Sequence, residues 1–446
     1  MRKLIILVLA LSIVLSYLFW RFGPNINIGN FNSNGEDPNQ PVTITVWGLW
    51  EEENLIRPAI EEYKKVRPNV TVEYEYKTSL NYRTRTQTQI AENQGPDIFM
   101  IHNSWLPMFL KSNSVLPAPA NVFTVNDLRT NFYPIVADSF TSNNQVYGVS
   151  RGVDGLALYY NVDLLKNAGI ATVPTTWPEL AEAAKRVTVI DAAGKIQTSG
   201  LAIGAVGNVD HWSDILGLLF LQQPNTSFEN PGDERGQTIV NFYTQFVIDP
   251  RNKTWDTSME PSTQAFAAGR LAFYFAPSWR AFEIRNANPE LQFRIAPVPQ
   301  LPGGNIANWG NFWGYAVSSK SLQQKESWEF LKFLTSAQSE KLLYQEASKV
   351  RLMGLPYSRL DLKQEIEADP LAGAFVTQAP TYKSWYLNSD TRDQGINDEI
   401  TKYYEDAINT VLAGGNAGQA LQTTSQGIQQ VLQKYTGPTQ GAPTAQ

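Results

Sequence analysis

Three β-rich runs near the start of the chain are separated by two stretches with helical periodicity. The runs cover residues 42–47, 70–76 and 95–101. Between them, residues 55–63 place apolar side chains on one helical face, and residues 87–93 belong to a polar helix. A strand–helix–strand order requires crossover connections, which are typical of parallel sheets covered by helices. The sequence therefore predicts an α/β fold.

Polar and aromatic side chains follow two of these predicted strands. The sequence GLWEE comes after the first strand and contains Trp50 and Glu51, and HNSW comes after the third and contains Asn103 and Trp105. In open α/β sheets, ligands bind beyond the carboxyl ends of the strands. We therefore expect a ligand site where these two segments meet.

Charge, cysteine content and motifs exclude several classes of protein. The chain of 446 residues has a net charge of −6 and no basic block, so we expect no nucleic-acid partner. It contains no cysteine, which excludes disulfides, thiol catalysis and a lipid-modified cysteine anchor. No HExxH motif, glycine-rich phosphate loop or EF-hand loop is present, so we expect neither a metal nor another cofactor.

The N-terminus indicates export from the cytoplasm. A basic start, MRK, precedes an apolar run from Leu4 to Trp20. At about 17 residues, the run is at the lower limit for a membrane-spanning helix, and no clear small-x-small cleavage site follows it. We favour an uncleaved membrane anchor over residues 1–22, with a cleaved signal peptide as the alternative. Residues 23–41, rich in Asn, Gly and Pro, read as a flexible linker.

The order of several further motifs resembles the extracellular sugar-binding proteins of ABC importers, of the maltose-binding type. These motifs are WGLW, PDIF, YGVSRGVDGLALYYNVDLL, PTTWPEL, FAAGRLAFYFAPSW, IAPVPQLPGG and SWEFLKFLTS, and the resemblance covers nearly all of residues 42–435. It implies a two-lobed α/β fold of the periplasmic-binding-protein (Venus flytrap) type with a central cleft. It further implies that the lobes are joined by crossing segments near residues 149–153, 275–278 and 334–336.

The same resemblance implies how the chain divides between the lobes. The first lobe is expected to consist of residues 42–150 and 277–335, and the second of residues 151–276 and 336–435. Residues 436–446, whose composition is low in apolar side chains, are expected to form a disordered tail.

A sugar presents flat C–H faces and a rim of hydroxyl groups. Aromatic rings cover the faces, and charged or amide side chains pair with the hydroxyls. Segments at the cleft should therefore combine tryptophan with acidic, amide or arginine side chains. Arg351 is added because the resemblance places a cleft contact there. The predicted ligand-binding residues are Trp50, Glu51, Asn103, Trp105, Arg151, Asp154, His211, Trp212, Trp279, Asn308, Trp309, Asn311, Trp313 and Arg351.

The most unusual of these segments is residues 308–318, NWGNFWGYAVS, which places bulky rings among glycine and asparagine. We interpret Trp309 and Trp313 as stacking on the ligand, with the glycines allowing the backbone to approach it. Core packing is the alternative for each tryptophan. It is the preferred assignment for Trp177 and Trp328, which lie on amphipathic predicted helices.

One motif suggests a different chemistry. GVSRG at residues 148–152 matches the GxSxG nucleophile elbow of serine hydrolases. That elbow leads from a strand into a helix, whereas here the β-rich LALYYN follows, and only His102 and His211 could serve as a base. A glycosidase needs two carboxylates about 5–10 Å apart, which the sequence leaves open.

We therefore interpret the chain as the extracytoplasmic solute-binding component of an ABC importer and not as an enzyme. It is expected to capture a sugar or oligosaccharide and to deliver it to membrane permease subunits. It should act as a monomer held by its N-terminal helix at the outer face of the cytoplasmic membrane. A glycosidase, a binding protein for a peptide or another non-sugar solute, and an adhesive surface protein remain as alternatives.

Overall fold

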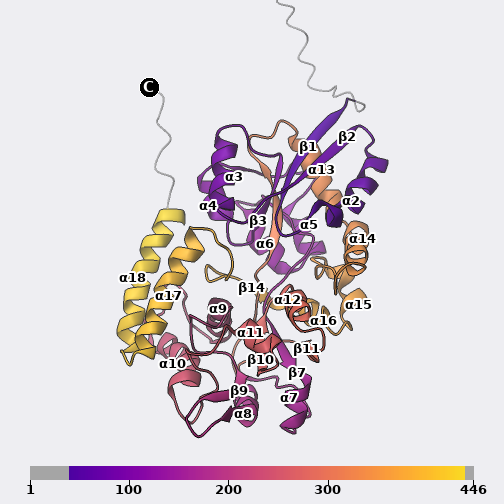
Figure 1. Ribbon diagram of the computed structural model, residues 1–446. Helices are drawn as coiled ribbons and strands as arrows, with labels where there is room; N and C mark the ends of the chain where they lie inside the picture. The colour runs from indigo at the N-terminus through magenta and orange to yellow at the C-terminus, as the bar shows by residue number, and fades with distance from the viewer. Residues whose placement is uncertain (1–39, 437–446) are drawn as a thin grey trace, which may run out of the picture. The chain divides into compact units, whose positions relative to one another are not determined.

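A computed structural model describes residues 40–436 of the chain. These residues form two five-stranded sheets, each packed against helices (Figure 1). The predicted anchor over residues 1–22, almost all of the predicted linker and the predicted tail lie outside the described residues. Among residues 40–436, no helix combines the length and the hydropathy that a membrane span requires.

The first sheet has the strand order β2-β1-β3-β13-β4. Its strands are β1 (Val42–Gly48), β2 (Val70–Tyr76), β3 (Ile98–His102), β4 (Val115–Leu116) and β13 (Trp313–Ser318). β1 pairs in parallel with β2 and β3, which confirms the predicted order of the first three strands. β13, from far along the chain, pairs antiparallel with β3 and β4.

The helices of this half follow the expected crossovers. α2 (Glu53–Val66) and α3 (Tyr82–Ala91) connect the first three strands. The others are α4 (Leu106–Lys111), α5 (Val125–Asn131), α6 (Pro134–Phe140), α13 (Gln324–Leu334) and α14 (Ala337–Ser348), and a small hairpin is formed by β5 (Thr141–Ser142) and β6 (Gln145–Val146). α14 packs against α2, so both helices cover the first sheet.

The second sheet has the order β11-β7-β10-β9-β8. Its strands are β7 (Ala157–Asn161), β8 (Val189–Ile190), β9 (Ile196–Leu201), β10 (Leu271–Ala276) and β11 (Phe293–Ala296). Every residue of β10 is buried, as expected for a central strand with both faces covered. The helices of this half are α7 (Val162–Asn167), α8 (Trp177–Val187), α9 (Trp212–Gln222), α10 (Glu234–Ile248), α11 (Ser262–Ala267) and α12 (Arg280–Ala287).

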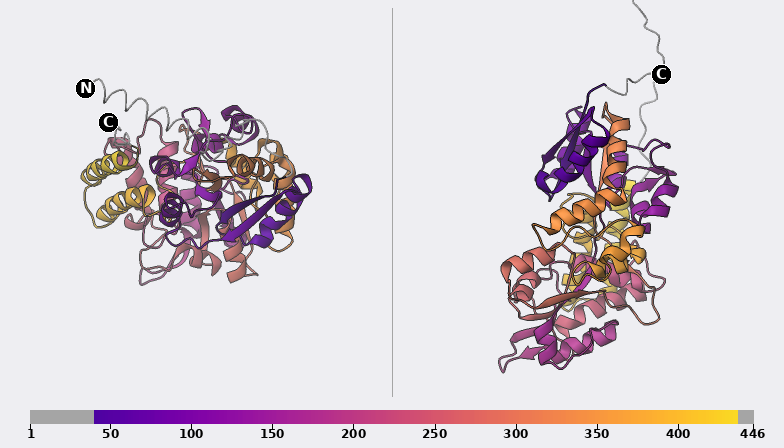
Figure 2. Two further views of the ribbon diagram at one scale, coloured as in Figure 1. Left: turned by 90° about the horizontal axis from the view of Figure 1, so that it is seen from above. Right: turned by 90° about the vertical axis from the view of Figure 1, so that its right-hand side faces the viewer.

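The remaining elements follow α14. They are α15 (Lys363–Ile366), α16 (Gly373–Gln378), β14 (Tyr382–Lys383), α17 (Ile396–Leu412) and α18 (Ala417–Thr436), and short 3₁₀ helices lie at Leu360–Leu362 and Ala379–Thr381. β14 pairs with β12 (Asn308–Trp309). α17 and α18 lie side by side, as the yellow helices of Figure 2 show, and both pack against α10. α18 also contacts α4, so this helix pair touches both halves.

Two stretches of chain run antiparallel between the sheets. Bridges join Val149 to Tyr315 and Gly155 to Gly310, and the amide of Leu156 donates to the carbonyl of Trp309 at 3.0 Å. The first crossing, residues 149–156, agrees with the predicted position. The second crossing was predicted at residues 275–278 but lies at residues 309–315. β10 ends at that earlier point, and the chain then returns to the second sheet as β11.

The third crossing also lies later than predicted. Residues 334–336 only join α13 to α14, and both of these helices belong to the first sheet. The chain leaves that sheet after α14. The amide of Val153 donates to the carbonyl of Pro356 at 2.9 Å, so residues 349–358 form the third crossing beside the first.

The predicted domain boundaries at residues 277 and 336 need the same correction. Residues 277–308 lie with the second sheet, because β11 pairs with β7. Residues 337–348 lie with the first sheet, because α14 packs against α2. Below, the first and second lobes are the parts of the chain built around the first and second sheets.

Candidate functional site

A cavity of about 750 Å³ lies between the two lobes, next to the three crossings. We call it the main cavity. The predicted residues that line it are Trp50, Glu51, Arg151, Asp154, His211, Trp279, Asn311, Trp313 and Arg351. Five others, Asn103, Trp105, Trp212, Asn308 and Trp309, do not line it.

The lining residues of the two lobes come from the carboxyl ends of parallel strands and from the segments beside them. Trp50 and Glu51 directly follow β1, and Trp279 directly follows β10. Trp313 opens β13, opposite the end of β3. The site therefore lies at the edge of the sheets where α/β folds bind ligands.

Trp50 is held in a strained conformation that presents its ring to the main cavity. Its φ of +66° is in the left-handed region, which is uncommon for a residue other than glycine, and its side chain is 46% exposed. A hydrogen bond of 2.6 Å from the hydroxyl of Tyr74 to the carbonyl of Glu51 fixes the turn. The Trp50 ring lies edge-on to that of Trp313, with 5.8 Å between centroids. Strain of this kind is typical of functional sites.

Trp279 offers a ring from the second lobe. It is 38% exposed, and the guanidinium of Arg280 lies 4.2 Å from its ring centroid. The imidazole of His211 packs edge-on against the same ring at 5.9 Å. Accessible indoles from both lobes therefore face one cavity.

Trp309 corrects the sequence interpretation of the NWGNFWG segment. Its ring is fully buried against α9, so close to Gly217 that a Cβ there would lie 2.4 Å from the indole. Its Nε1 donates a hydrogen bond of 2.7 Å to Oδ1 of Asp214. Trp309 therefore holds the second crossing against α9 and has no surface for a ligand.

Trp105 and Trp212 also lie away from the main cavity. Trp105 is buried beneath Trp313, with 4.9 Å between their ring centroids, and stacks on Phe109. Trp212 begins α9 and packs half-buried against the core. Trp105 thus supports the Trp313 ring from beneath and does not itself line the main cavity.

The two remaining asparagines serve the backbone. Oδ1 of Asn103 accepts from the amide of Phe312 at 3.2 Å, and Nδ2 of Asn308 donates to Oγ1 of Thr381 at 2.6 Å. Asn103 instead lines a smaller cavity of about 270 Å³ beside α4 and α6. Both side chains thus form hydrogen bonds beside the second crossing, although Nδ2 of Asn103 is buried without a partner within the described residues.

A cluster of three charged side chains joins the first and third crossings to the turn after β1. Nη2 of Arg351 lies 2.9 Å from Oε1 of Glu51, and Nη2 of Arg151 contacts Oε2 of the same carboxylate. Burial and the neighbouring Arg151 lower the pKa of Arg351 to about 10. The Arg351 guanidinium also lies 5.3 Å from the ring centroid of Phe282 in the second lobe. This cluster therefore spans the main cavity.

Asp154 faces the main cavity from the first crossing, and its carboxylate binds the second lobe. Its oxygens accept from the amide of Ser278 at 2.9 Å, from the Ser278 hydroxyl at 2.7 Å and from the amide of Gly155 at 2.8 Å. Burial raises the pKa of Asp154 from 3.8 to about 6, although these hydrogen bonds oppose the shift.

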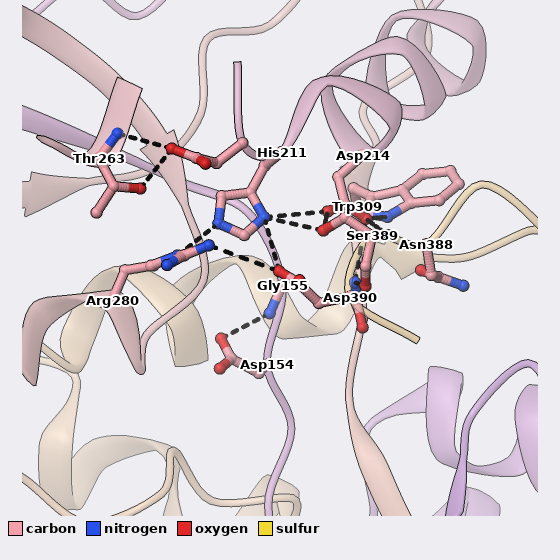
Figure 3. Close-up of polar contacts among 12 residues, drawn as sticks. Asp154, Gly155, His211, Asp214, Thr263, Arg280, Trp309, Asn388, Ser389 and Asp390 are labelled. Carbon is pink, nitrogen blue, oxygen red and sulfur yellow. Dashed lines mark hydrogen bonds and ion pairs between the residues drawn. The ribbon is translucent and has the colours of Figure 1, made fainter. Parts of the chain in front are cut away.

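His211 lies between the Arg280 guanidinium and the side chains of Asp214 and Ser389 (Figure 3). Nε of Arg280 lies 3.0 Å from its Nε2, so that nitrogen accepts, and its Nδ1 lies 2.8 Å from Oγ of Ser389. Ser389 belongs to a segment that the sequence interpretation missed. Together with Asp390 and Arg392 it lines the main cavity. In the sequence, this polar loop has no apolar periodicity, and the only signal near it is an aromatic residue, Trp385.

Ser150 of the GVSRG motif is not placed as a nucleophile. Its hydroxyl is buried and contacts the carbonyls of Gly152 and Trp313 at 2.5 and 2.7 Å. The chain continues as an extended crossing into β7 instead of a helix. Among the described residues, no group of three or more His, Cys, Asp or Glu side chains is close enough to hold a metal ion.

Comparison with known proteins gives a family match. The family model described as bacterial extracellular solute-binding protein matches residues 50–341. The multiple sugar-binding protein of Streptococcus mutans is 22% identical over 348 residues, 73% of this chain and 79% of that protein. The maltotriose-binding protein of Pyrococcus abyssi is 21% identical over 301 residues, 66% of this chain and 62% of that protein.

Solved structures of the same kind share the fold. The sugar-binding protein MalE from Xanthomonas citri aligns with a TM-score of 0.71 at 20% identity, covering 88% of this chain and 98% of that one. A cyclo/maltodextrin-binding protein complexed with maltotetraose also gives a TM-score of 0.71, at 18% identity, covering 89% and 99% of the two chains.

Proposed function

Because the chain belongs to the bacterial extracellular solute-binding protein family, we propose that it captures a sugar or oligosaccharide in the main cavity and delivers it to an ABC permease. One observation carries the choice of ligand: Trp50 and Trp313 from the first lobe and Trp279 from the second line one cavity. Relatives that are named for binding maltotriose and multiple sugars support it. The protein is a binding component and not an enzyme.

The indoles supply stacking and the polar lining supplies hydroxyl partners. Each aromatic contact with a sugar face contributes roughly 0.5–1.5 kcal/mol. Glu51, Asp154 and Asn311 offer acceptors on the same surface, and Arg351 offers donors. Of the predicted binding residues, we keep the nine that line the main cavity.

Ligand binding should favour approach of the two lobes. Contacts with Trp50 and with Trp279 form together only when the lobes approach, so a bound sugar shifts the population toward the closed form. Rotation would be absorbed by the three crossings, as in hinge-type domain closure. The closed form is the one that would dock on the permease.

A thermal-shift screen of the full-length chain against mono- and oligosaccharides tests this proposal. Ligand at 100 times its Kd stabilises the folded state by about 2.7 kcal/mol, which gives a clear rise in Tm. Small-angle scattering should show a smaller radius of gyration with the same ligand, and the ligand should be recovered unchanged. If no saccharide raises Tm, the proposed ligand class is wrong. Release of new reducing ends would instead indicate a glycosidase.

We also propose that residues 1–22 anchor a monomeric protein at the outer face of the membrane. The extracellular family and the apolar run from Leu4 support this. Full-length protein should sediment with membranes, and a chain lacking residues 1–22 should not. If the chain expressed with residues 1–22 is recovered in the soluble extracellular fraction without them, the segment is a cleaved signal peptide.

A further inference from the structure

Two arginine side chains share one carboxylate at the edge of the main cavity. Arg151 and Arg351 both contact Glu51, one at each carboxylate oxygen. Glu51 and Arg151 are each only 8% exposed, so water screens this cluster poorly. With two guanidinium groups and one carboxylate, the Glu51 cluster carries a net charge of +1.

The other carboxylates that face the main cavity bind groups outside this cluster. Asp154 is bound to Ser278, and the side chains of Glu283 and Asp390 both lie against Arg280. Next to the Glu51 cluster the lining is apolar, with Leu49, Met100, Phe282 and Leu355.

Glu340 lies behind the cluster and is almost fully buried, at 2% exposure. Its Oε1 lies 2.6 Å from Oγ of Ser358, and the same Oγ lies 2.6 Å from the carbonyl of Ser150. A hydroxyl donates one proton, and the carbonyl can only accept it. Both contacts of the Ser358 hydroxyl are hydrogen bonds only when Glu340 is protonated and donates to it, and burial raises the pKa of Glu340 well above its ordinary value, which favours that form.

The guanidinium groups retain capacity to bind an anion. Nε of Arg151 has no hydrogen-bond partner within the described residues, so the donors of this cluster are not all satisfied, although this buried atom itself has no surface toward the main cavity. Burial, together with the positive charge of the neighbouring Arg151, lowers the pKa of Arg351. A buried charge without a counter-charge is costly, and a ligand that supplies one recovers that cost on binding.

We propose that the ligand is an acidic saccharide, a uronate whose carboxylate pairs with Arg151 and Arg351 while its ring stacks on the tryptophans of the main cavity. The inference rests on the proposed function and narrows it. A planar carboxylate matches the two-pronged donor of arginine. These two side chains already hold one such group, that of Glu51.

Titration calorimetry of the full-length chain with matched trisaccharides tests the inference. The acidic probes are trigalacturonate and trimannuronate, and the neutral probes are galactotriose, mannotriose and maltotriose. An acidic trimer should bind about tenfold or more tightly than its neutral counterpart, since charge-assisted hydrogen bonds are about twice as strong as neutral ones. A neutral trimer that binds as tightly as the acidic ones overturns the inference and leaves the proposed function standing. Binding of none of the five overturns the inference, whereas the proposed function fails only if no saccharide of the thermal-shift screen raises Tm.

Arg351→Gln separates ligand recognition from a structural role. The substitution leaves Glu51 and Arg151 as a neutral pair, so the variant should fold and keep or raise its Tm. It should lose about tenfold or more in affinity for the acidic trimer and little for a neutral one. Equal losses for both kinds of trimer would show that Arg351 only shapes the cavity. The matched control is Lys349→Gln, because Lys349 is exposed on the same crossing and paired with Glu346.

Discussion

Nε1 of Trp309 donates a 2.7 Å hydrogen bond to Oδ1 of Asp214, whose residue is only 1% exposed. The same oxygen accepts from Nδ2 of Asn311 and from the amide of Ser389, each at 3.1 Å. One buried carboxylate therefore joins α9, the second crossing and the loop that closes one side of the main cavity.

Trp309→Phe should lower the free energy of unfolding by about 3 kcal/mol, because it removes a hydrogen bond to a charged group and leaves part of the indole volume empty. Urea unfolding measures this change. Affinity for the saccharide should change less than about threefold in the folded variant, since the ring has no ligand surface. Trp279→Phe is the control and should cost under about 0.5 kcal/mol, because that ring is exposed. A large loss of affinity with unchanged stability for Trp309→Phe would contradict this assignment.

Trp50→Gly should make the protein a poorer binder with little change in stability. Glycine adopts a positive φ without the steric cost that Trp50 pays at +66°, but the substitution also removes the contact with Trp313 and adds entropy to the unfolded chain, so the free energy of unfolding should change by less than about 1 kcal/mol. Loss of the ring should raise Kd for the saccharide by about three- to tenfold. Urea unfolding gives the free energy of unfolding, and calorimetry on the same preparation gives Kd. Leu322→Gly, at an exposed position with no part in the cavity, is the control for affinity. An unchanged Kd would exclude Trp50 from the site.

The different environments of the two tryptophans in the NWGNFWG segment could not be predicted from the local sequence. Each is followed by glycine and lies within two residues of an asparagine, so the local pattern does not distinguish them. Their different fates depend on Asp214 and Gly217, almost a hundred residues earlier in the chain, which receive the ring of Trp309. Local patterns did predict the parallel start of the first sheet and the position of Trp50 after β1. They carry no information on a partner so distant.

The second and third crossings were misplaced for a related reason. The run that ends β10 resembles a strand leaving a sheet, and only the pairing of β11 with β7 shows that the chain stays in the second lobe. Likewise, the pair α13 and α14 is assigned to the first sheet by packing of α14 on α2. Ser389, Asp390 and Arg392 were missed because a polar loop has no periodicity to read.

Asp154→Asn should remove some of the pH dependence of stability. Burial raises the pKa of Asp154 in the folded protein from 3.8 to about 6, so the folded state binds the proton more tightly than the unfolded state does. The free energy of unfolding of the wild type should therefore fall as pH rises from about 4 to about 6, by on the order of 3 kcal/mol from this group. Urea unfolding at several pH values should show a flatter profile for the variant. Parallel profiles would mean that Asp154 titrates normally in the folded protein.

Ionisation of Glu340 at higher pH should weaken the contact between the first and third crossings. The chain of contacts from Glu340 through the Ser358 hydroxyl to the carbonyl of Ser150 requires a protonated carboxyl, which is only 2% exposed. Since burial raises its pKa well above the ordinary value of 4.5, stability from this group is complete at pH values below 4.5. That stability is lost as pH rises toward the folded-state pKa.

Glu340→Gln isolates this contribution, because the glutamine amide can donate to Ser358 Oγ at every pH, and its oxygen can accept from the Ser358 amide as Glu340 does at 3.2 Å. Between pH 5 and 9, the variant should gain stability relative to the wild type with each step upward, measured as the midpoint of urea unfolding. Glu346 lies on the same helix, and within the part of the chain that the structure describes its carboxylate pairs with Lys349, so Glu346→Gln should keep the wild-type slope. If Glu340→Gln and the wild type change in parallel across this range, Glu340 is ionised throughout. Ser358 would then donate to it, and the carbonyl of Ser150 would lose that hydrogen bond.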